Sequence, residues 1–267
     1  MGCPPIKRML PFGNPKPPTN PSWEAIRKLN NHVITYPSPT DPDVILYSVK
    51  LDVLELPVEY EAIINIIPAQ YGLAPSTSQP SPQQTGLSLG EVAYPPYDFY
   101  IHVGQGRPDI ATLEVMARRA GYKKPDNQNH VIPGHQCPDL GFDIALPEKL
   151  HTNVDSHALL HDLTYHDGLE GIRLSEDAGL YLCEFTYYVS LACSQLVTSA
   201  SRSSHFASTK VLSTEQISTT TSRSQTMNPF VLFIHVPPET QDFPIERSQE
   251  MVLKIIQWVG GQACTSE

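Results

Sequence analysis

The amino-acid sequence of residues 1–267 predicts an α/β fold in which helices cover both faces of a mostly parallel, twisted sheet, and its length allows one large domain or two small ones. Two observations predict it. Short apolar segments with the composition of buried strands alternate with segments whose apolar residues recur at helical spacing. The connections between them vary in length, and alternating strands and helices favour a parallel sheet that helices cover on both faces.

The N-terminal part is expected to contribute a loop, two helices and a strand. Residues 1–22 are rich in proline and are expected to form a loop. Asn20 and Pro21 have the residue types of an N-cap and a first helical position, so a short helix is predicted to begin there. Segment 44–56 is dense in β-branched and aliphatic residues, which predicts a buried strand, and segment 58–67 has apolar residues at helical spacing.

The remaining elements follow from the same criteria. A core strand is predicted at 98–103, and the glycines of the following Gly104-Gln105-Gly106 allow close backbone approach at the ligand-binding end of an open sheet. Segment 110–120, which contains Glu114, is predicted as a helix or a strand. Further elements are a short strand at 171–174, a buried apolar helix that begins near Cys183, a strand at 230–235 and an amphipathic helix at 252–259.

Two stretches of low complexity interrupt this pattern. Residues 74–97 are rich in Pro, Ser and Gln, and residues 198–228 are rich in Ser and Thr. Such compositions cannot bury enough apolar surface to offset the entropy of ordering the chain. We expect both stretches to be long, flexible insertions.

Composition excludes several classes of partner. The formal net charge is −10, which argues against nucleic acid because a phosphate backbone requires a basic surface. There is no run of 18 apolar residues, so no membrane partner is expected. The five cysteines are widely spaced without a CxxC pair, which suits a reducing compartment and predicts a cytoplasmic protein.

Cys183 and His235 are the first candidates for chemistry. Cys183 follows a turn signal at the expected start of the apolar helix, where the positive end of the helix dipole favours a thiolate. His235 ends the strand at 230–235, the end at which α/β folds place functional groups, and it is a plausible base for the thiol. Free cysteines are often simply buried, so the pattern predicts a cysteine hydrolase only when the two residues are taken together.

His157, His161 and His166 suggest a metal site instead. His157 and His161 are four residues apart and can share a helix face, but the intervening sequence lacks the glutamate of an HExxH motif. No cysteine pair supports a structural zinc site. We therefore expect a solvated histidine cluster and no metal, and a metal-dependent hydrolase remains an alternative hypothesis.

Several blocks of the sequence resemble the type I pyroglutamyl peptidases, cysteine peptidases that remove an N-terminal pyroglutamyl residue. The most specific is the nucleophile block at 175–188, which contains Asp-Ala-Gly-Leu-Tyr-Leu-Cys. Supporting blocks, in the family's order, lie at 11–13 with 20–25, at 102–105 with 112–114 and 121–127, and at 233–238.

The resemblance implies a single α/β/α sandwich and a hydrolase that needs no cofactor. It implies Cys183 as the nucleophile, His235 as the general base and acid, and Glu114 as the group that orients His235. Phe12 and Gln105 correspond to residues that bind the pyroglutamyl ring. The expected partners are peptides that begin with pyroglutamate.

The sequence also departs from the family's pattern. Residues 1–9 make a poor match to the first core strand, and Met9 stands in the place of one of the two pocket aromatics. The stretch 198–228 replaces a short connection, which is tolerable because loop-closure entropy grows slowly with length. These departures leave a second hypothesis, a catalytically inactive member of the family that binds pyroglutamyl ends or keeps only the fold.

Overall fold

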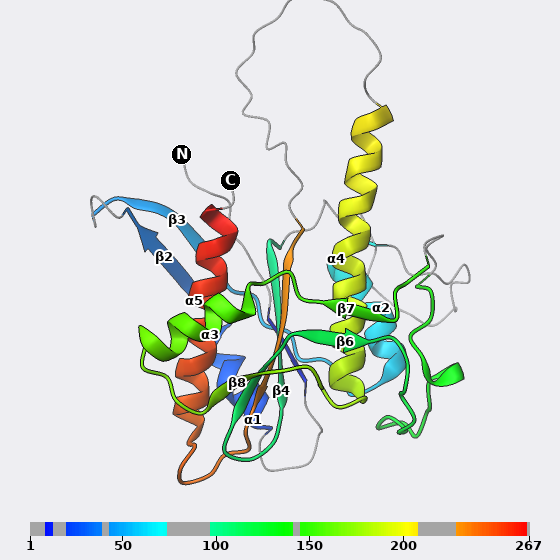
Figure 1. Cartoon of the computed structure of the whole chain (residues 1–267), viewed down its shortest axis with the longest axis horizontal. Coiled ribbons are helices and arrows are strands. Elements are labelled where there is room, and N and C mark those ends of the chain that lie inside the picture. The colour runs from blue at the N-terminus through cyan, green and yellow to red at the C-terminus, as the bar shows by residue number, and fades with distance from the viewer. Residues whose placement is uncertain are drawn as a thin grey trace, which may run out of the picture.

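A computed structural model of the chain describes residues 9–12, 20–38, 43–73, 97–140, 145–207 and 228–265. Within these residues the backbone alternates between strands and helices as the sequence predicts (Figure 1). The strands of the central sheet are β1 (Met9–Phe12), β4 (Phe99–Gln105), β5 (Ala111–Glu114), β8 (Ile172–Ser175) and β9 (Phe230–Val236).

The central sheet is mixed and mostly parallel, with the strand order β1-β4-β9-β5-β8. The pairs β1–β4, β4–β9 and β5–β8 are parallel, and only the β5–β9 pair is antiparallel. The predicted core strands at 98–103, 171–174 and 230–235 are therefore confirmed, each within two residues of its expected bounds. Segment 110–120, predicted as helix or strand, forms strands β5 and β6 (Met116–Arg118).

Helices cover both faces of this sheet, so the predicted α/β/α sandwich is confirmed (Figure 1). One apolar core lies between the sheet and helices α2 and α4, and a second lies between the sheet and helices α1, α3 and α5. The helices are α1 (Pro21–Ile26), α2 (Tyr60–Gln70), α3 (Ser156–Tyr165), α4 (Leu182–Ala207) and α5 (Ile245–Thr265), with two 3-10 turns, η1 (Arg27–Leu29) and η2 (Pro133–His135).

Helix α1 begins where the sequence predicts. The side chain of Asn20 accepts a hydrogen bond from the amide of Ser22 at 3.1 Å, and Pro21 is the first helical residue. This cap satisfies one of the amides that a helix start leaves without an intrahelical acceptor. The helix then buries Ala25 and Ile26 in the core beside α5.

The prediction of a long buried strand at 44–56 is wrong. The strand there, β3 (Ile45–Lys50), is shorter and pairs with β2 (Val33–Pro37) in a separate antiparallel hairpin. Ile45 is 50% exposed and Leu46 is 48% exposed, and only the end of the strand is buried. A dense apolar composition does not distinguish the half-exposed strand of a hairpin from a strand of the central sheet.

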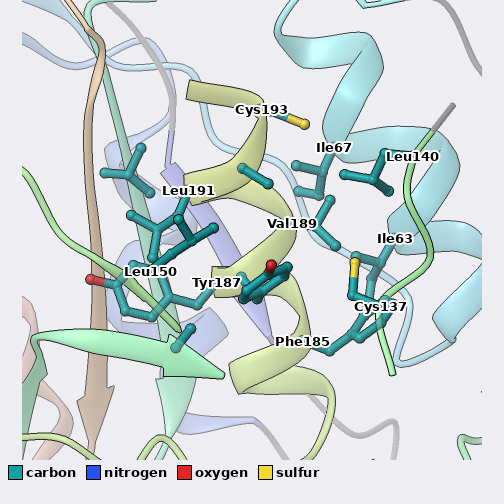
Figure 2. Packing of buried hydrophobic residues seen from close by; sticks show 14 of the residues in the cluster. Ile63, Ile67, Cys137, Leu140, Leu150, Phe185, Tyr187, Val189, Leu191 and Cys193 are labelled. Carbon is teal, nitrogen blue, oxygen red and sulfur yellow. The ribbon is translucent and has the colours of Figure 1, made fainter. Parts of the chain in front are cut away.

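Helix α4 packs across the sheet and is buried nearly all round at its start, as its composition predicts. Figure 2 shows Ile63 and Ile67 of α2 and Val189 of α4 in the same interface, with Cys137 and Leu140 beside them. The helix continues to Ala207. It therefore includes the first ten residues of the stretch 198–228, and the predicted boundary of that insertion lies too early in the sequence.

The other parts of the two predicted insertions, residues 74–96 and 208–227, lie outside the described residues. Strands β6 and β7 (Lys149–His151) form a small antiparallel sheet of their own, which packs on α4. In the part of the chain that the structure describes, no helix is long and apolar enough to cross a bilayer.

Candidate active site

Strand register brings the predicted site residues into two adjacent rows across the central sheet. In the first row Phe12 pairs with Gly104, Gly104 pairs with His235, and His235 pairs with Thr112. In the second row His102 pairs with Phe233, and Phe233 pairs with Glu114. Because neighbours across a sheet point to the same face, the side chains of the last two strands in each row meet on the α4 side.

Glu114 and His235 are in direct contact. His235 Nδ1 lies 2.8 Å from Glu114 Oε1, and the hydroxyl of Thr112 donates to the same oxygen at 2.6 Å. The Glu114 side chain is 1% exposed and that of His235 is 10% exposed. A buried carboxylate held in this way fixes the orientation of the imidazole and stabilises its protonated form.

Cys183 lies in the first turn of α4, and its thiol is among the groups that raise the pKa of His235. Burial alone would lower the pKa of His235, but hydrogen bonding to Cys183 and Glu114 outweighs burial and raises this pKa to about 10. Burial would raise the pKa of Glu114, yet His235 and the hydroxyls of Ser175 and Thr112 lower it. The site therefore favours a charged imidazole beside the Cys183 thiol.

The other cysteines with described side chains have a different environment. Burial raises the pKa of the Cys137 thiol to about 12, and burial also raises the pKa of the Cys193 thiol well above its ordinary value. Neither thiol has a histidine among the groups that shift its pKa. Of these three cysteines, only Cys183 has the surroundings of a nucleophile.

Gly104 and Gly106 allow the close approach that the sequence predicts. A Cβ atom on Gly104 would lie 2.9 Å from Phe233 Cζ and 3.3 Å from Cys183 Sγ. A Cβ atom on Gly106 would lie 2.7 Å from His235 Cβ. A larger residue at either position would displace the thiol or the imidazole, so both glycines are required for the geometry of the site.

The two predicted substrate-binding residues lie at the same end of the sheet. Phe12 is the last residue of β1 and its backbone pairs with Gly104. Gln105 is the last residue of β4, is exposed, and lies directly between the two glycines of the site. Met9, at the start of β1, pairs with Ile101, and residues 1–8 lie outside the described residues.

Sequence reasoning missed several residues of the site. Thr112 was noted only as part of a motif, although its hydroxyl holds Glu114. Arg118, which none of the sequence arguments above singles out, forms an ion pair with the fully buried Glu184 at the start of α4. The only available signal was the presence of a charged residue, Glu184, within an otherwise apolar helix.

The histidine cluster lies elsewhere. Among the described residues, one group could hold a metal ion, formed by His161, Asp162 and His166 with ligand atoms within 4.8 Å of one another. His157 is not part of it. Helix α3 belongs to the core on the opposite face of the sheet from α4, so this exposed cluster does not meet Cys183.

Comparison with known proteins gives a consistent result. The chain is 32% identical over 183 residues to pyroglutamyl-peptidase 1 of Rattus norvegicus and to that of Homo sapiens, an alignment that covers 68% of the chain and 68% of each relative. No family model matches the chain.

Solved structures of pyrrolidone carboxyl peptidases share the fold. The enzyme from Thermococcus litoralis superposes with a TM-score of 0.63 at 12% identity, covering 98% of this chain and 96% of that one. The enzyme from Thermus thermophilus superposes with a TM-score of 0.57 at 16% identity, covering 94% and 99%.

Proposed function

The chain belongs to the pyroglutamyl-peptidase family, and we propose that it is a cysteine peptidase that hydrolyses the amide bond after an N-terminal pyroglutamyl residue. One observation carries this proposal beyond family membership: His235 contacts a buried carboxylate and also interacts with the thiol at the start of α4. Nucleophile, base and orienting group in this order can form and break a thioester.

The reaction begins with attack of the Cys183 thiolate on the pyroglutamyl carbonyl carbon. The carbonyl oxygen becomes an oxyanion next to the first backbone amides of α4, which have no intrahelical acceptor and can donate to it. His235, protonated and held by Glu114, gives its proton to the departing amine. The carbon–nitrogen bond breaks and a pyroglutamyl thioester remains on Cys183.

Hydrolysis of the thioester uses the same residues in reverse. His235, now neutral, takes a proton from water, and the resulting hydroxide attacks the thioester carbon. The carbon–sulfur bond breaks, free pyroglutamate leaves, and the proton held by His235 restores the initial thiolate–imidazolium pair. No cofactor takes part in either half of this sequence.

Recognition of the substrate is assigned to the edge formed by β1 and β4. Pyroglutamate is a neutral lactam, so its pocket needs apolar surface and a few polar groups for the ring amide. We assign the apolar surface to Phe12 and the border of the pocket to Gln105, which follow from the family resemblance and from their position next to Gly104. Because Met9 stands in place of a second aromatic residue, we expect the pyroglutamyl ring to bind more weakly.

The test is hydrolysis of a fluorogenic pyroglutamyl amide by the purified chain. We expect turnover of this substrate, none of the corresponding prolyl amide, and loss of turnover by at least about a thousandfold in Cys183→Ala. Cys193→Ala is the matched control, because it removes a buried thiol of the same helix and should leave kcat unchanged. A folded wild-type protein without turnover would contradict the proposal and favour the inactive member of the family.

A further inference from the structure

The turn that leads into α4 has an unfavourable backbone conformation. Gly179 has φ of 99° and Leu180 has φ of 48°, both in the left-handed region. Glycine adopts this region readily, but a branched residue such as leucine does so at a cost, so the surrounding structure must hold it there. Three residues further on is Cys183, and the position of its backbone depends on this turn.

A fully buried carboxylate holds the turn. Glu184 Oε2 accepts a hydrogen bond from the amide of Leu180 at 2.7 Å and from Arg118 Nη2 at 2.8 Å. Glu184 Oε1 accepts from Arg118 Nε at 2.6 Å and from the Arg118 amide at 3.0 Å. Both oxygens thus have two donors, and the charge of the buried carboxylate is compensated by the guanidinium.

Asp177 extends this arrangement to the start of the turn. Its Oδ1 accepts from the Gly179 amide at 3.2 Å and also from Arg118 Nη2. The Asp177 side chain is 60% exposed, so its contribution is smaller than that of the buried Glu184. One guanidinium group therefore joins two carboxylates that each bind a backbone amide of the turn.

Arg118 is itself fixed by the small sheet and the core. It is the last residue of β6, and the hydroxyl of the buried Tyr122 donates to its carbonyl oxygen. The turn packs against the same segment, because a Cβ on Gly121 would lie 2.9 Å from Leu180 Cδ2. The arginine thus links the turn to a rigid part of the molecule.

We infer that Arg118 and Glu184 form a clamp that sets the backbone of residues 179–183, and that Arg118 is a positioning residue for the nucleophile. This inference rests on the proposed function. An oxyanion site works because its donors are in place before the charge develops, so an error in the turn reduces the rate of acylation.

The test compares Glu184→Gln with the wild type. A glutamine amide can still accept from Arg118 but offers one acceptor oxygen in place of two, so the Leu180 amide loses its partner or competes for it. We expect kcat for the pyroglutamyl amide to fall about tenfold to a hundredfold with KM within about twofold. We also expect hydrogen exchange of the Leu180 amide to accelerate and alkylation of Cys183 by iodoacetamide to slow.

Asp139→Asn is the matched control. Arg119 and Asp139 form an ion pair of the same chemical kind one residue away, and Asp139 is 69% exposed and does not contact the turn. We expect this variant to keep wild-type kcat, exchange and alkylation. If Glu184→Gln does not fold, Asp177→Ala removes the exposed acceptor of the Gly179 amide and should lower kcat severalfold with faster exchange at Gly179.

Two results would overturn the clamp. The first is a folded Glu184→Gln protein, or Asp177→Ala in its place, with wild-type kcat and unchanged exchange in the turn. The second is a loss of activity that matches only the fraction of unfolded protein, which would make the network purely structural. If the wild type does not hydrolyse pyroglutamyl amides, the proposed function fails, whereas exchange and alkylation still decide whether the clamp exists.

Discussion

The two faces of the central sheet are built from the same strands but differ in chemistry. The buried side chains that β4 and β9 contribute to the face toward α1, α3 and α5 are all apolar: Phe99, Ile101, Val103, Leu232, Ile234 and Val236. The face toward α2 and α4 receives the alternate residues, which include His102, Gly104 and His235 from these strands and Thr112 and Glu114 from β5.

The difference between the faces follows from the two-residue period of a strand. Moving one residue along β5, from Glu114 to Leu113, changes a group that contacts His235 into a group that contacts the opposite core. The face toward α1, α3 and α5 therefore contributes only to stability. The face toward α2 and α4 also holds the buried polar groups of the site, and burying such groups lowers stability unless they have hydrogen-bond partners. Substitutions at adjacent positions should separate these contributions.

The largest effect is expected from the pair Glu114→Gln and Leu113→Ala. Glu114→Gln removes the charge that holds a protonated His235, so kcat should fall by about a hundredfold to ten-thousandfold. Leu113→Ala leaves a cavity on the other face and should lower the free energy of unfolding by about 2–5 kcal/mol. Its kcat per folded molecule should stay within about twofold of wild type. Urea unfolding and steady-state kinetics on both variants measure this contrast. Equal losses of kcat in the two variants would contradict the assignment of catalysis to one face and stability to the other.

Gly104→Ala is expected to have the next largest effect. The new methyl group meets the rigid ring of Phe233 and the thiol of Cys183, and displacing a nucleophile by a fraction of an ångström costs about tenfold to a hundredfold in kcat. Gly261→Ala is the control, because a Cβ on that helical glycine would lie 3.5 Å from Tyr36, an ordinary contact distance. It should raise the midpoint of thermal unfolding slightly and leave kcat unchanged. Wild-type kcat in Gly104→Ala would contradict the proposed geometry.

The pH dependence of stability should report on His235. Its pKa is raised from 6.5 to about 10 in the folded protein, so the folded state keeps a proton that the unfolded state releases. The stabilisation is complete below pH 6.5 and is lost as the pH rises through about 10. Urea unfolding at a series of pH values should show a decline over this range that is weaker in His235→Asn. Parallel profiles for the two proteins would contradict the assignment.

His102 should have the smallest and opposite effect. It is fully buried, neither ring nitrogen has a hydrogen-bond partner among the described residues, and burial lowers its pKa to about 3. The unfolded state therefore binds a proton that the folded state does not, and the free energy of unfolding falls as the pH drops below 6.5. His102→Leu should flatten this decline, and His161→Leu, an exposed histidine, should leave it unchanged. If the free energy of unfolding of His102→Leu declines at low pH as steeply as that of the wild type, His102 gains a proton in the folded state and the assignment is wrong.

Much of the fold could be predicted because its signals are local. The cap at Asn20, the helical spacing of Tyr60, Ile63 and Ile67, and the apolar run before His235 each depend on a few neighbouring residues. The prediction of a long buried strand at 44–56 was wrong, because the pairing of an apolar strand with the central sheet or with a hairpin depends on its partner strand and not on its own composition. The predicted start of the insertion at residue 198 was too early, because Ser and Thr do not by themselves end a helix that begins in the core.

The site divides in the same way. Glu114, Cys183 and His235 could be named because each lies in a specific motif, and the structure brings them together. The contacts that hold them could not be predicted, because Thr112 reaches Glu114 only through the pleat of β5 and Arg118 reaches Glu184 across 66 residues of sequence. An ion pair between distant residues has no local pattern, so Arg118 resembled any other surface arginine.

Trapping the acyl-enzyme tests the central claim most directly. The protein is mixed with a pyroglutamyl ester, quenched with acid during turnover, digested and examined by mass spectrometry. We expect a mass increase of one pyroglutamyl group on the peptide that contains Cys183, and no such increase in Cys183→Ala. Turnover without this adduct, together with undiminished turnover by Cys183→Ala, would show that the chemistry does not take place on this face of the sheet through Cys183.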